Sequence, residues 1–139
     1  MNIIPGQGLW LKGRFANGTQ CDYNRPFLVI ENTGTIIKAL NVSSLRGKET
    51  KLIIPSNKNL SKHFPPFPQP SFVKLDEIYH YESFSELEQS VMSSGKCLDT
   101  GLLSQVISWH SLYSSENRTW TVDMKRSELI LLNPIFATT

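Results

Sequence analysis

The chain has 139 residues, of which 19% are charged and 40% are hydrophobic, and its formal net charge is +2. This length accommodates one domain with a single modest core, and the composition excludes a chain that is disordered throughout. The sequence pI of about 8.6 is compatible with a local patch for nucleic acid, but it is too mild to identify the partner.

No apolar run in the sequence approaches the roughly 20 residues that a helix needs to span a bilayer. Residues 1–6 lack the basic and apolar regions of a signal peptide. Cys21 and Cys97, the only cysteines, are too far apart in sequence for a metal knuckle or a redox motif. We therefore expect a cytoplasmic protein with two unlinked thiols and no membrane partner.

The first part of the sequence has the pattern of β structure. Residues 8–15 form a short apolar and aromatic strand, and the Asn17-Gly18 pair that follows is a strong turn signal. Residues 26–30 and 35–42 are two further apolar segments, separated by four turn-forming residues. This spacing predicts an antiparallel hairpin at the centre of a sheet.

The middle of the sequence predicts mixed structure. Residues 52–55 are expected to form another short strand, which a proline ends. Residues 56–70 are rich in proline, which resists both helix and regular pairing, and they predict a surface loop. Residues 71–81 alternate apolar and polar side chains and predict one or two short strands that close the β core. A capping-box pattern then predicts a helix over residues 84–94.

The last part of the sequence predicts a second helix. Asp99 or Thr100 would cap it, and one apolar side would pack on the sheet. That side is formed by Leu102, Leu103, Val106, Ile107 and His110. Residues 119–134 fit either a strand or hairpin or a short helix, because the apolar run is too short for its periodicity to decide.

One end of the predicted hairpin carries the candidate site. Arg25 precedes Pro26 at the start of the first strand, and Ser43 and Ser44 follow the second. In an antiparallel pair these ends are adjacent, so a guanidinium and a hydroxyl would meet there. A guanidinium fork matches a phosphodiester, and a hydroxyl beside it suits cleavage of an RNA backbone. The alternative is a loop cation in a surface salt bridge beside serines that only end a strand.

Four segments together resemble the PemK/MazF family of bacterial toxins in their order and spacing: residues 8–11, 25–30, 41–44 and 70–78. The resemblance covers roughly residues 6–80, and the related ToxN/AbiQ toxins resemble the same segments less well. It implies an α+β, mainly β, fold in a single domain over residues 1–139. Residues 1–82 would form a small, strongly bent SH3-like β-barrel, and residues 83–139 a helical and C-terminal extension.

Members of this family are metal-independent endoribonucleases that cut single-stranded RNA, usually messenger RNA. By resemblance Arg25 is the catalytic arginine that stabilises charge on the phosphorane, and Ser43, where many members have threonine, binds the phosphate. Ser44 is the alternate, one residue along. Asp22, in the loop before Arg25, is the nearest acidic candidate for the general acid or base. More distant candidates are Asp76, Glu77 and His80.

Further residues are expected to bind RNA. Arg46, Lys48 and Lys51 form a basic loop after Ser44 that would track the RNA backbone, and a solvated loop is the alternative. Lys58 and Lys62 would extend this track. Tyr23 and Phe27, and also Trp10 and Phe15, would stack on bases, and packing in the core or at its rim is the alternative. The histidines lack ligand spacing, so we expect no metal and no cofactor. They are His63, His80 and His110.

The resemblance also implies partners and leaves alternatives. A homodimer would form the RNA groove, and a cognate antitoxin protein would lie along that groove and block Arg25. In the first alternative, the protein is a noncatalytic SH3-like barrel that binds nucleic acid or a protein. In the second, it is a toxin with the same barrel that acts on a protein target such as gyrase.

Overall fold

The computed structural model describes residues 3–60 and 65–137, and one long strand, β3 (Ile36–Ser44), organises its sheet. β3 pairs along one edge with β2 (Arg25–Asn32), which pairs in turn with β1 (Gly8–Leu11), and both pairings are antiparallel. The predicted central hairpin is thus confirmed. The first strand is shorter than expected, because β1 ends at Leu11.

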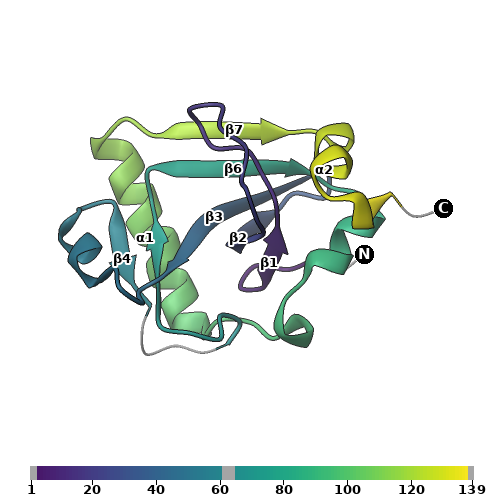
Figure 1. Ribbon diagram of the computed structural model, residues 1–139. Coiled ribbons are helices and arrows are strands. Elements are labelled where there is room, and N and C mark those ends of the chain that lie inside the picture. The colour runs from purple at the N-terminus through teal and green to yellow at the C-terminus, as the bar shows by residue number, and fades with distance from the viewer. Residues whose placement is uncertain (1–2, 61–64, 138–139) are drawn as a thin grey trace.

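The other edge of β3 is shared by two strands. Its first half pairs with β6 (Glu77–Glu82) and its last three residues pair with β5 (Ser71–Lys74), both antiparallel. β4 (Asn57–Asn59) extends the β5 side, and β7 (Trp120–Met124) runs parallel to β6 (Figure 1). The architecture is a mostly antiparallel sheet with a few helices, so the mainly β, α+β class is confirmed.

Both faces of the sheet are buried. On one face, α1 (Thr100–Glu116) packs through Leu102 and Val106 on apolar side chains of β2, β3 and β5 (Figure 1). The Asp99 carboxylate caps this helix by accepting a hydrogen bond from the Leu102 amide at 3.0 Å. The predicted second helix is therefore confirmed, although Ile107 on its expected inner side is exposed.

The C-terminal segment covers the opposite face. After β7 the chain forms α2 (Arg126–Leu132) and a short 3₁₀ helix, η4 (Pro134–Phe136), so residues 119–134 contain both a strand and a helix. The Asn133 side chain bonds both backbone groups of Lys12, accepting from its amide at 2.7 Å and donating to its carbonyl at 2.8 Å. The segment therefore belongs to the same core as β1.

Two predicted elements are wrong. Residues 52–55 do not form a strand: η1 (Glu49–Ile53) is a 3₁₀ helix, and its Ile53 side chain is 85% exposed. The helix over residues 84–94 is replaced by two 3₁₀ turns, η2 (Ser85–Ser90) and η3 (Ser93–Gly95). Contacts with the sheet prevent a continuous helix here, because Val91 bridges to Leu9 and the Met92 amide donates to the Gly8 carbonyl at 2.8 Å.

The proline-rich segment is less irregular than expected. β4 occupies part of it, and Leu60 and Phe67 are buried in the core under α1, so its description as a surface loop is wrong for these residues. Residues 61–64 lie outside the described part. Within that part, no helix combines the length and the apolar character that crossing a membrane requires.

Candidate functional site

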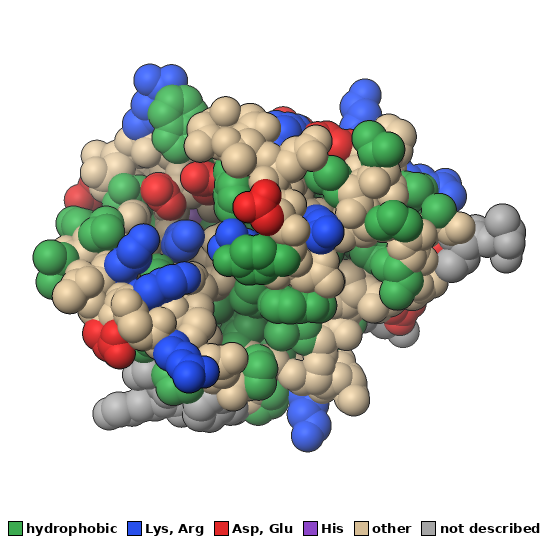
Figure 2. Space-filling model, in the orientation of Figure 1, with side chains coloured by type: hydrophobic (Ala, Val, Ile, Leu, Met, Phe, Trp, Pro, Cys, Tyr) green, Lys and Arg blue, Asp and Glu red, His purple; other side chains and the backbone are tan. Residues whose placement is uncertain are grey.

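A cleft of about 630 Å³ opens where β2 begins and β3 ends. Arg25, Ser43, Ser44 and Lys48 all line it, together with apolar side chains from other parts of the chain. Figure 2 shows hydrophobic side chains gathered in a hollow on this face, with Lys and Arg side chains grouped beside it. The cleft has the size of sites that hold small organic ligands.

The register of the hairpin explains why Arg25 and Ser43 share this cleft. Phe27 pairs with Asn41, so extending the pairing by two residues sets Arg25 opposite Ser43. The buried Asn41 side chain donates a hydrogen bond to the Pro26 carbonyl at 3.1 Å and holds the two strand ends together. The structure thus brings together the two side chains that the sequence singled out.

Arg25 is held by aromatic rings rather than by acidic groups. Its guanidinium carbon lies 4.1 Å from the centre of the Tyr23 ring and 5.6 Å from that of Phe15. Its Nε atom is buried and has no hydrogen-bond partner, and no carboxylate among the described residues forms an ion pair with it. Stacking orients the guanidinium, and no ion pair with the described residues neutralises its charge.

The two serines have different surroundings. Lys48 Nζ donates to Ser43 Oγ at 3.3 Å, so this hydroxyl lies beside a second cation of the cleft. Ser44 Oγ accepts from the Arg46 amide and donates to the Gln69 side chain, both at 3.2 Å. Ser44 therefore fixes the neighbouring loops, and Ser43 is better placed to bind a ligand.

Lys74, at the end of β5, adds a cation that the sequence analysis missed. Burial lowers the pKa of Lys74, and the positive charges of Lys51 and Arg25 lower it further, while Asp76 and Glu77 act in the opposite direction. Burial, followed by the charge of Glu77, raises the pKa of Asp76. Lys74 does not line the cleft, but the charge of Arg25 contributes to the lowering of its pKa.

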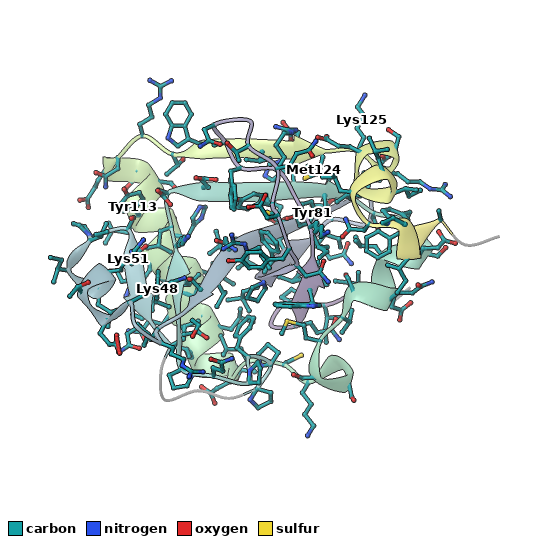
Figure 3. The ribbon with its side chains drawn as sticks, viewed as in Figure 1. Lys48, Lys51, Tyr81, Tyr113, Met124 and Lys125 are labelled. Atoms are coloured by element: carbon teal, nitrogen blue, oxygen red, sulfur yellow. The ribbon has the colours of Figure 1, made fainter. Side chains whose placement is uncertain are left out.

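Lys48 and Lys51 lie together on the β4 side of the molecule, far from Lys125 (Figure 3).

Several predicted site residues lie elsewhere. Phe27 is fully buried and packs edge-on against Tyr79 and Tyr81, with ring centres 5.0 and 5.6 Å apart, so the prediction that it stacks on RNA bases is wrong. Asp22, Arg46 and Lys51 are exposed, but they do not line the cleft.

The remaining candidates are also outside the cleft. Lys58 lies 5.8 Å from the centre of the Trp109 ring, and His80 lies 3.3 Å from the Asp123 carboxylate. Burial lowers the pKa of His110, which contacts Ser114 on α1. Lys62 and His63 lie outside the described residues.

No arrangement of three or more His, Cys, Asp or Glu side chains suited to a metal ion occurs in residues 3–60 and 65–137. Cys21 and Cys97 are both free thiols, the first buried and the second partly buried. No protein-family model matches this chain, and no curated protein matches it. The geometry of the cleft is therefore the basis on which we infer a function.

Proposed function

We propose that this protein is a metal-independent endoribonuclease that binds single-stranded RNA in the cleft and cleaves it beside Arg25. One observation carries the proposal: the Arg25 guanidinium, which has no acidic partner within residues 3–60 and 65–137, and the Ser43 hydroxyl line the same cleft, next to an apolar wall. RNA offers phosphates to the cations and unstacked bases to the wall. The cations of the cleft can thus bind the phosphate of a nucleotide, and the apolar wall can bind its base.

The chemistry is a transfer within the RNA chain. The 2′-oxygen attacks the adjacent phosphorus, the bond from phosphorus to the 5′-oxygen breaks, and a cyclic phosphate remains. Arg25 donates hydrogen bonds to the phosphorane oxygens as their charge develops, and Ser43 with Lys48 holds the phosphate. The proposed general acid or base is Asp22, an exposed carboxylate three residues before Arg25 in the loop that leads into β2.

The proposed fold and partners follow the PemK/MazF resemblance. β3 pairs with β6 and then with β5 along the same edge, an arrangement that is compatible with the proposed SH3-like barrel. A homodimer and a cognate antitoxin that blocks the cleft belong to the same proposal, as does a cytoplasmic location.

A noncatalytic module that binds nucleic acid or a protein is the second candidate. The identity of the ionisable side chains in the cleft favours this candidate. Among the described residues, those that line the cleft are Tyr23, Arg25 and Lys48. None of them is a carboxylate or an imidazole, the groups most often used for proton transfer. A binding module needs the cations and the apolar wall alone.

Incubation of the protein with a long single-stranded RNA in the presence of a chelator tests the proposal. We expect fragments that end in cyclic phosphate, and Arg25→Ala should reduce the rate by about a hundredfold to a thousandfold. Arg118→Ala is the matched control, because Arg118 also stacks on an aromatic ring, 4.2 Å from the centre of Trp120, but does not line the cleft. RNA that is bound but intact would favour the binding module. Equal cleavage by Arg25→Ala would refute the assigned site.

A further inference from the structure

The cleft has an apolar wall that takes no part in the chemical step of the proposed cleavage. Trp10 on β1 lines it and is 48% exposed, and Phe67, Val91 and Met92 lie in the same wall. Trp10 pairs with Pro26, the residue after Arg25, and both Trp10 and Arg25 line the cleft. A large aromatic ring that stays exposed beside a cation is a stacking surface for a base.

A segment from outside the family resemblance builds one side of this wall. The Met92 amide donates to the Gly8 carbonyl at 2.8 Å, and Val91 bridges to Leu9, so residues 91 and 92 lie along the edge of β1. The missing side chain of Gly8 makes room for the wall. A Cβ atom there would lie 3.1 Å from Met92 Sδ and 3.2 Å from Phe67 Cε1. The wall is therefore formed by close packing of Met92 and Phe67 against Gly8.

The polar side chains around the wall divide into occupied and available groups. The hydroxyls of Ser71, Ser90 and Ser93 donate to backbone carbonyls of the protein. The amide nitrogens of Gln69 and Gln89 have no hydrogen-bond partner among the described residues, although Gln69 accepts from Ser44. A glutamine side chain carries both a donor and an acceptor, so it can bond the edge of a base.

We propose that this wall is a base-binding subsite, in which one unstacked RNA base stacks on Trp10 while the phosphate next to it contacts Arg25. The available groups of Gln69 and Gln89 bond the edge of that base. This inference rests on the proposed function in taking single-stranded RNA as the ligand, and it adds the residues that select one nucleotide of the substrate. The cations supply affinity for the backbone, and the subsite supplies preference for a base.

The test uses 2′-O-methyl RNA octamers, which lack the attacking hydroxyl and report binding alone. One octamer is complete and the others each lack a single base. Fluorescence anisotropy should show that loss of the base at one position weakens binding to the unmodified protein about 10-fold. Trp10→Ala should bind the complete octamer about 10-fold more weakly, and it should lose nothing further when that base is removed.

Two variants control for unrelated effects. Trp10→Phe keeps an aromatic ring and should restore most of the affinity, which a general folding defect would not allow. Trp120→Ala removes a tryptophan of similar exposure, 46%, that does not line the cleft, and it should bind like the unmodified protein. Circular dichroism and thermal melting establish that each variant is folded.

The outcomes separate the subsite from the proposed nuclease. Wild-type affinity of Trp10→Ala for every octamer would overturn the subsite, whether or not native RNA is cleaved. Base-dependent binding through Trp10 without any cleavage of native RNA would overturn the nuclease and leave the subsite in place. An unmodified protein that binds no octamer would overturn both.

Discussion

The guanidinium carbon of Arg25 lies 4.1 Å from the centre of the Tyr23 ring, and the two residues are separated by one position in the loop that leads into β2. Arg14 shows the contrasting arrangement, because its Nε donates to the Glu128 carboxylate at 2.8 Å and its charge is neutralised in the fold. The stacked arginine keeps its charge and its donors. Arg118 also stacks on an aromatic ring, but Arg25 lines the cleft and can meet an anionic ligand there.

The ring of Tyr23, and not its hydroxyl, should support the rate of RNA cleavage. A stacked cation at a partly exposed site is stabilised by roughly 0.5–1 kcal/mol, so Tyr23→Ala should lower the RNA cleavage rate about threefold by releasing Arg25 from its orientation. Tyr23→Phe keeps the ring and should cleave at nearly the original rate. Single-turnover assays compare the three proteins. If Tyr23→Phe lost as much activity as Tyr23→Ala, the phenol group and not the stack would be the important element.

Lys74→Met should raise stability and weaken RNA binding at the same time. Burial lowers the pKa of Lys74, so the charged form is unfavourable in the folded protein, and an apolar side chain of similar length should increase the free energy of unfolding at pH 7 by about 1 kcal/mol. The variant also removes a positive charge that acts on Arg25, so binding of single-stranded RNA should weaken slightly although Lys74 does not line the cleft. Urea unfolding and anisotropy titrations measure the two effects.

The stability gain from Lys74→Met should depend on pH in a defined direction. The folded pKa of Lys74 lies below its usual 10.5, so between these values the unfolded chain binds the extra proton and the folded protein does not. The contribution of Lys74 to stability therefore rises as pH increases through this window. The advantage of the variant should shrink as the pH approaches 10.5. A constant advantage from pH 7 to 10.5 would contradict the lowered pKa.

The part of the site that depends on local structure could be predicted from the sequence. The hairpin turn brings β2 and β3 together, and the Asn32 side chain accepts from the Gly34 amide at 2.8 Å within that turn. These local signals are enough to place Arg25 at the same end of the sheet as Ser43 and Ser44. They do not decide between the two serines, because a bulge between Val29 and Glu31 shifts the register by one residue. Lys74 was missed because its position relative to Arg25 depends on how β5 pairs with the end of β3.

The wall of the cleft could not be predicted, because it depends on contacts between distant segments. Residues 84–94 have a sequence suited to a helix, yet the bridge from Val91 to Leu9 and the hydrogen bond from Met92 to Gly8 extend the chain there. Long-range pairing overrides local helix propensity in such a segment. By contrast α1 was predicted, since its Asp99 cap and its apolar stripe are local features.

Asn133→Ala should destabilise the whole domain. The side chain is buried and bonds the amide and the carbonyl of Lys12, and it also donates to the Leu129 carbonyl at 2.9 Å. Removal leaves the backbone groups of Lys12 without these partners, so we expect a loss of about 2–4 kcal/mol in the free energy of unfolding. Leu131→Ala, at a position that is 76% exposed, should change it by less than about 0.5 kcal/mol. Urea titrations with matching slopes provide the comparison.

Gly8→Ala should disturb the apolar wall of the cleft more than its cationic part. An added Cβ would lie 3.1 Å from Met92 Sδ and 3.2 Å from Phe67 Cε1, so both side chains must move by a few tenths of an ångström, at a cost of about 1 kcal/mol. Preference for one base should fall in the octamer assay, while the dependence of binding on Arg25 should remain. Retained base preference would show that the wall does not need this packing.

Gly34→Ala provides a matched comparison for this last prediction. Gly34 has a φ of +97° in the hairpin turn, with no atom within 4 Å of an added Cβ, so its substitution strains the backbone by roughly 1–2 kcal/mol without touching the cleft. The two glycine variants should therefore lose comparable stability and differ in RNA binding. If Gly34→Ala also lost base preference, reduced stability and not the shape of the wall would explain the effect of Gly8→Ala.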